Sequence, residues 1–286
     1  MKFIKYESKE KFLEENLEIL LREEAKNEIM IGITLEHEID KTKKWLLGRI
    51  EKNNEVKAIF LIEDDREGLL IYSLEENISD EVVNCLVDNI IALKIDIKEV
   101  LTSKKSALKI SEIYSRKMAK EMYIDQEMYI LKFDKIREEY LLNEGEIVEK
   151  LSEITDLKNI QANVKEMYQD NYRGRYCSDE EAIKVAKAFL KKGLYVLRNE
   201  RNEIVSQAVT VRKQINGCAI GGVITFEKYR GHGYAKRLVY TLCEKLLKEG
   251  KKYIVLHVNS QNEQAISIYT KIGFDKIDET AKVKFI

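Results

Sequence analysis

The stretch Thr225-Phe-Glu-Lys-Tyr-Arg-Gly-His-Gly-Tyr-Ala-Lys-Arg-Leu238 decides the fold of the second half of this chain. The apolar and β-branched residues 219–225 that lead into it predict a buried strand. Leucines at helical spacing follow it, and Gly250 supplies a helix stop. The stretch therefore predicts the end of a strand, a tight loop that contains two glycines, and the start of a helix.

The loop has the composition of a phosphate-binding loop. A helix start leaves its first backbone N–H groups unpaired and carries the positive end of the helix dipole. Small residues at Gly231, Gly233 and Ala235 would let a phosphate approach these N–H groups closely. Basic side chains surround the same point: Arg230, Lys236 and Arg237. We expect the loop to hold a diphosphate, and the alternative is an ordinary surface turn.

A second motif follows at a fixed distance. Residues 254–259 predict another strand, and Asn262-Glu-Gln-Ala-Ile-Ser-Ile-Tyr-Thr-Lys-Ile-Gly-Phe274 predicts a short helix closed by glycine. The order of strand, R-x-x-G-x-A, helix, strand and N-x-x-A-x-x-x-Y-x-x-x-G-F resembles the GNAT superfamily of acyl-CoA-dependent N-acyltransferases. Two linked motifs are more specific than either one alone. The resemblance is strong over residues 146–286 and weak before them.

Length and composition indicate two cytoplasmic domains. The chain has 286 residues, is 44% hydrophobic and 35% charged, and carries a net charge of −1. That charge predicts no general attraction to nucleic acid or membranes, and neither a targeting segment nor a membrane-spanning run is expected. Four scattered cysteines predict reduced thiols and no metal site: Cys85, Cys177, Cys218 and Cys243.

The first half predicts a mixed α/β domain. The expected helices are at 8–27, 79–93 and 104–120, and residues 28–35 either continue the first of them or form a short helix of their own. The expected strands are at 56–63, 68–73, near Val100 and at 127–133. This order echoes the second half, but neither motif occurs in it. We therefore expect a degenerate GNAT-like domain at 1–136, a linker at 137–145 and a catalytic GNAT domain at 146–286. The alternative for the first half is an unrelated α/β cap.

The resemblance implies a fold with splayed central strands and a set of residues for acetyl-CoA. Backbone groups of Val223, Ile224 and Thr225 would bind the pantetheine arm. The diphosphate would lie on the loop and helix start, at Arg230, Gly231, His232, Gly233, Tyr234, Ala235 and Lys236. Asn262 would bond to the pantetheine arm or the strand ends, and Ala265 would leave room for the cofactor.

The resemblance also implies catalytic roles. Tyr269 would lie beside the thioester sulfur as a general acid, and its alternative is a half-buried helix aromatic. Many family members place a glutamate on the strand at 217–225, but this chain has no carboxylate there. His257, on the next strand, is a candidate base because imidazole titrates near neutral pH. The alternatives are a histidine bonded on the far side of the sheet and a water chain with no dedicated base.

The acceptor site is expected between the first two helices of the second domain and the hairpin that follows them. Two arginines flanked by tyrosines could grip a carboxylate or phosphate of the acceptor, and the alternative is an exposed loop. These candidate residues are Tyr172, Arg173, Arg175 and Tyr176.

The sequence therefore predicts an N-acetyltransferase that transfers acetyl from acetyl-CoA to a primary amine of a small molecule or peptide. Direct attack in a ternary complex is favoured because neither motif contains a cysteine. One alternative is a CoA-binding sensor or interaction module without turnover. Another is an amino-acid N-acyltransferase that uses longer acyl-CoA. The expected assembly is a monomer or a homodimer.

Overall fold

The computed structural model describes residues 1–36, 45–63, 68–151, 157–171 and 176–286. The chain forms two compact units that are not contiguous in sequence. Unit 1 contains Met1–Ile130, Val258–Asn262 and Lys276–Ile286, and unit 2 contains Leu131–His257 and Glu263–Asp275. Strand β6 (Met122–Phe133) runs from unit 1 into unit 2.

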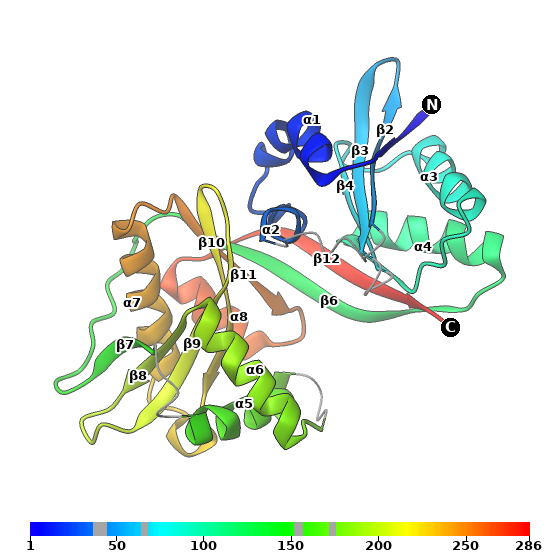
Figure 1. The fold of residues 1–286 in the computed structure, drawn as a ribbon. Coiled ribbons are helices and arrows are strands. Elements are labelled where there is room, and N and C mark those ends of the chain that lie inside the picture. Colours follow the sequence, from blue (N-terminus) through cyan, green and yellow to red (C-terminus); the bar gives the residue numbers. More distant parts are fainter. Residues whose placement is uncertain (37–44, 64–67, 152–156, 172–175) are drawn as a thin grey trace. The chain divides into compact units, whose positions relative to one another are not determined.

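Unit 1 is a mixed sheet with helices (Figure 1). Its strand order is β1-β2-β3-β4-β5-β12-β6, in which β4 and β5 are parallel and the pairs β1–β2, β2–β3, β3–β4 and β5–β12 are antiparallel. The strands besides β6 are β1 (Lys2–Tyr6), β2 (Trp45–Lys52), β3 (Glu55–Glu63), β4 (Gly68–Ser73), β5 (Glu99–Ser103) and β12 (Asp275–Phe285). The helices are α1 (Lys9–Leu21), α2 (Glu28–Glu36), α3 (Asp80–Ala92) and α4 (Lys104–Met118).

The last strand of the chain completes the sheet of unit 1. β12 pairs with β5 from Thr280 opposite Ser103 to Lys284 opposite Glu99. Three of its apolar side chains are buried in the core of unit 1: Ala281, Val283 and Phe285. The fold of unit 1 therefore depends on both ends of the chain.

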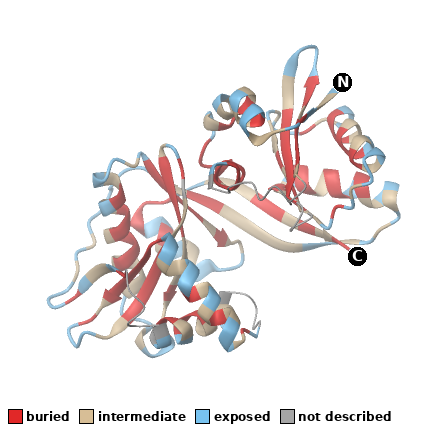
Figure 2. Ribbon diagram, in the orientation of Figure 1, coloured by how far each residue is buried: buried red, intermediate tan, exposed pale blue. Residues whose placement is uncertain are grey.

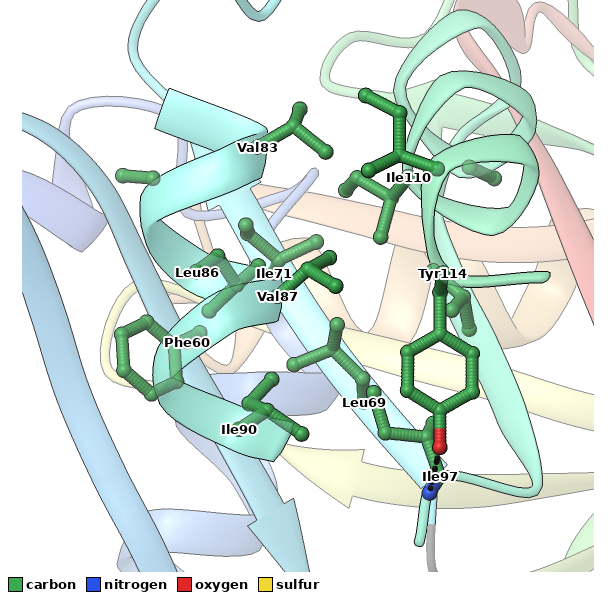
Figure 3. Packing of buried hydrophobic residues seen from close by; sticks show 14 of the residues in the cluster. Phe60, Leu69, Ile71, Val83, Leu86, Val87, Ile90, Ile97, Ile110 and Tyr114 are labelled. Atoms are coloured by element: carbon green, nitrogen blue, oxygen red, sulfur yellow. Dashed lines mark hydrogen bonds between the residues drawn. The ribbon is translucent and has the colours of Figure 1, made fainter. Parts of the chain in front are cut away.

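That core lies between the sheet and helices α3 and α4, where side chains from both helices meet Phe60 and Leu69 of the sheet (Figure 3). Burial of this apolar surface is the main force that stabilises such a layer. At its edge, the Tyr114 hydroxyl accepts a hydrogen bond from the backbone N–H of Ile97 at 2.9 Å. Figure 2 shows the same pattern over the chain: strands are largely buried and helices expose their outer faces.

Unit 2 has the strand order β11-β10-β9-β8-β7, with β10 and β11 parallel and the other neighbours antiparallel. Its strands are β7 (Ile147–Leu151), β8 (Leu194–Arg198), β9 (Ile204–Lys213), β10 (Gly217–Thr225) and β11 (Tyr253–Asn259). Its helices are α5 (Leu157–Asn171), α6 (Asp179–Lys192), α7 (Tyr234–Lys248) and α8 (Glu263–Ile272).

Helices cover both faces of the unit 2 sheet. Leu194, Val196 and Val209 pack in one cluster with residues of α5 and α6, which lie side by side in Figure 1. Tyr195 alternates with Leu194 and Val196 and so points to the opposite face. There, Lys245 of α7 lies 5.5 Å from the centroid of the Tyr195 ring. α7 therefore covers the face opposite α5 and α6.

Local signals in the sequence determine where α6 begins and ends. The Ser178 hydroxyl accepts a hydrogen bond from the N–H of Glu181 at 3.1 Å, which caps the helix start. Gly193 ends the helix with a φ of 117°, a conformation that glycine adopts at little cost. Ser178 and Gly193 therefore set the two ends of α6.

Candidate active site

The two central strands of unit 2 separate partway along their length. β10 and β11 pair only from Gly217 opposite Tyr253 to Ala219 opposite Val255. β10 continues to Thr225 while paired on its other edge with β9. Beyond Ala219, one edge of β10 therefore carries backbone N–H and C=O groups that β11 does not bind. Such groups need another hydrogen-bond partner.

A β-bulge lies within this separated part of β10. The register with β9 changes between Gly221, which is opposite Val209, and Ile224, which is opposite Gln207. Gly222 has a φ of +58°, and a Cβ atom there would lie 3.3 Å from Val209 and 3.4 Å from Phe189. Both the conformation and the tight packing favour glycine. Bulges redirect the neighbouring backbone groups and often occur next to active sites.

The loop after β10 ends in an uncapped helix start. Gly231 has a φ of +84° and Gly233 a φ of +76°, and α7 begins directly afterwards. Gly233 is the N-cap residue, so no side chain caps the first N–H groups of α7. A Cβ atom built on Gly231 would meet no other atom within 4 Å. The backbone of this loop is therefore open on the side of Gly231, as close approach of a phosphate requires.

Arg230 is tied to the strand end and to α5. It donates from Nε to the Thr225 carbonyl at 3.0 Å and from Nη2 to Oε1 of Glu166 at 2.9 Å. The same carboxylate oxygen accepts the N–H of Glu227 at 2.6 Å. His232 adds a contact within the loop, with Nδ1 2.8 Å from the Arg230 carbonyl. These bonds hold the loop against α5.

A second arginine anchors the start of α7. Arg237 donates to both carboxylate oxygens of Glu146, at 2.7 and 2.6 Å. Burial alone would raise the pKa of Glu146, but the hydrogen bonds from Arg237 and Asn143 and the charge of Arg237 together outweigh it and hold that pKa below its usual value. The Arg237 side chain is 12% exposed, and that of Glu146 is 3% exposed. Arg237 therefore serves to fix α7, and the nearby Lys236 amine lies 4.1 Å from the Tyr140 ring centroid.

Tyr269 lies on α8 and is buried, with 8% of its surface exposed. Its ring centroid is 5.8 Å from that of Phe274. Its carbonyl accepts the N–H groups of Gly273 and Phe274 at 3.2 and 3.0 Å, which closes the helix. Burial, and to a smaller extent Cys243, raises the pKa of Tyr269. Its hydroxyl is therefore protonated at neutral pH.

The other predicted residues are placed as follows. His257 lies half-buried on β11 beyond Val255, in the part of the strand that no longer pairs with β10. Ala265 is half-buried in the first turns of α8. The Asn262 backbone N–H donates to the Asn259 carbonyl at 2.9 Å, and Asn262 belongs to unit 1.

The predicted acceptor residues fall mostly outside the described part of the chain. Tyr172, Arg173 and Arg175 lie there, so their role stays a prediction. Tyr176 is described and is 81% exposed, next to the buried Cys177.

Three residues near this region carried no signal in the sequence. Glu166 and Glu146 bind the loop and α7 from positions 64 and 91 residues away from their arginine partners. Gln207 is fully buried on β9, and neither of its amide atoms has a hydrogen-bond partner in the described part of the chain. Only the strand register and the helix packing bring these residues to the site.

The described residues contain no group of three or more His, Cys, Asp or Glu side chains that could hold a metal ion. Within the same residues, every helix is too short or too polar to cross a membrane.

Comparisons with known proteins agree with this geometry. Residues 197–283 match the model of the FR47-like protein family. No curated protein matches the chain. A GCN5-related N-acetyltransferase from Sphaerobacter thermophilus has a TM-score of 0.65 at 13% identity, over 99% of this chain and 95% of that one. A GCN5-related N-acetyltransferase from Kribbella flavida has a TM-score of 0.57 at 12% identity, over 91% and 93%.

A tandem GNAT protein from the clavulanic acid biosynthesis pathway also shares the fold, with a TM-score of 0.55 at 10% identity, over 99% of this chain and 97% of that one. At these identities the likeness concerns the fold. The family match over residues 197–283 and the shared fold over the whole chain confirm the resemblance to the GNAT superfamily.

Proposed function

We propose that this protein is an N-acetyltransferase that transfers the acetyl group of acetyl-CoA to a primary amine by direct attack in a ternary complex. The observation that carries the proposal is the separation of β10 from β11, combined with the uncapped α7 start that follows it. Together they offer an extended backbone edge for an amide-containing arm and a helix N-terminus for a diphosphate. The GNAT fold and the FR47-like match support acyl transfer in general.

In this proposal the co-substrate lies along β10. Its diphosphate would bind the N–H groups at the start of α7, and its pantetheine arm would bind residues 223–225 along the edge of β10 that β11 does not pair with. When bound, acetyl-CoA supplies the thioester that the amine attacks. A backbone N–H near Ile224 or Thr225 would stabilise the negative charge that develops on the thioester oxygen. Holding both reactants in one orientation lowers the activation free energy by up to about 7–11 kcal/mol.

Tyr269 would donate a hydrogen bond to the leaving sulfur. A thiol ordinarily has a pKa of about 8.5, and that of a free tyrosine is about 10. Because burial raises the pKa of Tyr269 further, complete transfer of its proton to a thiolate would cost at least about 2 kcal/mol. Tyr269 therefore suits a role in which it stabilises the thiolate while the proton is only partly transferred.

The proton of the attacking amine needs another acceptor. β10 carries no carboxylate, and Glu166 is engaged by Arg230 and the Glu227 N–H. His257, on the separated part of β11, is the candidate base, either directly or through water. A water chain without a dedicated base is the alternative.

Unit 1 supports the proposal of a tandem protein with a degenerate first copy. Its β4 and β5 are parallel over only three pairs of residues, from Gly68 opposite Glu99 to Leu70 opposite Leu101, much as β10 and β11 are. The α3 start, however, is already occupied by acidic groups. The Glu75 carboxylate accepts the Ser79 N–H at 3.3 Å, and Asp80 and Glu81 lie in the first turn. These carboxylates would repel a diphosphate, so we expect one CoA site per chain.

Thiol release from acetyl-CoA, measured against amino acids, polyamines, aminoglycosides and peptides, tests the proposal. We expect amine-dependent release, and Tyr269→Phe should lower kcat by tenfold or more with CoA binding retained. Tyr240→Phe is the matched control, because Tyr240 is also a buried unit 2 tyrosine with a raised pKa. CoA binding without release by any amine would instead favour a CoA-binding sensor. The absence of both would refute the proposal.

A further inference from the structure

Gln207 occupies a special position beside the β10 bulge. It lies opposite Ile224 on β10 and opposite Val196 on β8. At the bulge, two β10 residues, Gly222 and Val223, lie opposite the single β9 residue between Gln207 and Val209. Gln207 is therefore the first β9 residue after the bulge.

The side chain of Gln207 points toward α5 and α6. Residues that are directly opposite each other in an antiparallel pair project to the same face of the sheet. Val196 packs with residues of α5 and α6, and Ile224 packs with Met167 of α5. Both neighbours place the Gln207 amide in the layer between the sheet and these two helices.

This layer contains a second side-chain amide whose hydrogen bonds are incomplete. Asn163 is 8% exposed and lies on α5 between Ile160 and Met167, both of which are buried. Its Nδ2 atom has no hydrogen-bond partner in the described residues. Asn163 thus faces the same layer from the helix side, while Gln207 faces it from the sheet.

A buried amide without a partner weakens a fold. Its N–H and C=O groups give up their bonds to water and gain nothing in return. Most buried polar side chains in native proteins are bonded, so an exception calls for an explanation. The packing of unit 2 does not explain the amide groups of Gln207 and Asn163 that have no partner in the described residues, since the clusters in this layer are apolar. The free bonding capacity is explained if a ligand uses it.

We propose that the Gln207 carboxamide, with Asn163 opposite it, binds the acceptor substrate beside the bulge. Oε1 of Gln207 would accept a hydrogen bond from the neutral amine, and Nε2 would donate to an oxygen of the acceptor. The acceptor class is thus a primary amine that also carries a hydroxyl or carbonyl oxygen. Met167 and Phe189 lie in the same layer, and they must move to admit it; a methionine changes rotamer at little cost.

This inference rests on the proposed function and assigns the acceptor end of the same site. Its test is Gln207→Met, which keeps the approximate length of the side chain and removes both hydrogen-bonding groups. Gln214→Met is the matched control. Gln214 is also a buried glutamine of unit 2, 5% exposed, but its Oε1 accepts the Tyr253 hydroxyl at 2.6 Å.

The two variants should behave in opposite ways. Gln207→Met should raise the melting temperature or leave it unchanged, and it should lower kcat/KM for the best amine of the panel by about tenfold or more with CoA affinity unchanged. Gln214→Met should lower the melting temperature and leave kcat/KM unchanged. Asn163→Leu should repeat the kinetic result of Gln207→Met.

The outcomes separate this inference from the proposed function. If the wild-type protein acetylates an amine and Gln207→Met does so with the same kcat/KM, the inference is wrong and the proposed function stands. If Gln207→Met lowers the melting temperature as much as Gln214→Met and spares kcat/KM, Gln207 serves the fold alone. If no amine drives thiol release by the wild type, the proposed function itself fails.

Discussion

A methyl group on Gly231 should abolish most of the affinity for CoA at a small cost in stability. Gly231 has a φ of +84°, and nothing lies within 4 Å of the Cβ position. Gly231→Ala therefore creates no clash inside the protein, and its cost is the strain of a positive φ, about 1–2 kcal/mol. The new methyl group would instead occupy the space through which we propose that the diphosphate reaches the loop.

The expected loss of affinity follows from the hydrogen bonds between the diphosphate and the backbone N–H groups of the loop. A hydrogen bond to a charged group contributes about 1.5–3 kcal/mol, so displacing the diphosphate from one N–H group should weaken binding by roughly 10- to 150-fold. Isothermal titration of CoA into the wild type and the variant measures this directly. Thermal unfolding of the same samples should show a fall of about 2–8 °C for a cost of 1–2 kcal/mol in a domain of this size.

Gly250→Ala is the matched control for this experiment. Gly250 has a φ of +92°, has no atom within 4 Å of its Cβ position, and follows the other end of α7. The strain should therefore be similar, while the substitution lies far along the helix from the loop. We expect Gly250→Ala to lose the same stability and to keep the wild-type affinity for CoA. Equal CoA affinity in Gly231→Ala and Gly250→Ala would refute the placement of the diphosphate.

Two further predictions concern stability. Phe285→Ala should destabilise unit 1 by about 3–5 kcal/mol, because this β12 side chain lies in the unit 1 core, with its ring centroid 4.8 Å from that of Tyr114. Unfolding in denaturant should show this loss of stability. An unchanged transition midpoint would mean that β12 does not complete the sheet. The pair of Glu146 with Arg237 should stabilise unit 2 fully above the ordinary glutamate pKa of about 4.3 and lose that contribution as the pH falls through the lowered pKa of the folded state. Glu146→Gln should therefore flatten the acid side of the stability-against-pH curve, and an unaltered slope between pH 5 and the acid transition would contradict the assignment.

Local signals in the sequence predicted the elements of unit 2 well. The strand at 219–225, the helix after Gly233, the strand at 254–259 and the glycine-closed helix are all present. In unit 1, the strands at 56–63 and 68–73 and the helices near 79–93 and 104–120 are confirmed as well. Each of these has a regular apolar pattern and a clear start or stop signal, which act over a few residues.

Elements that depend on distant partners were not predicted. β1 and β2 contain charged residues within short apolar runs, and their pairing with each other and with β3 determines them. The helix expected over 8–27 ends at Leu21, where a turn precedes α2. β12 was not foreseen, and its pairing with β5 joins residues about 180 positions apart in the chain. No local pattern in the sequence encodes such a pairing.

The candidate site shows the same division. The glycines of the loop, the missing carboxylate on β10 and the position of Tyr269 could be derived from the motifs. The motifs could not predict three other features of the site: the pair of Arg230 with Glu166, the pair of Arg237 with Glu146, and the burial of Gln207 without a hydrogen-bond partner in the described residues. Each of these depends on how α5, β7 and β9 pack against the elements that carry the motifs. The expected division into 1–136, 137–145 and 146–286 stays a prediction about domains, while compact unit 1 combines segments from both ends of the chain.

A crystal structure of the protein soaked in CoA tests the central claim most directly. We predict one CoA per chain, with its diphosphate on the N–H groups that open α7 after Gly233 and its pantetheine arm along residues 223–225 of β10. Electron density for the nucleotide at the α3 start, at any other place on the chain, or nowhere would contradict the account.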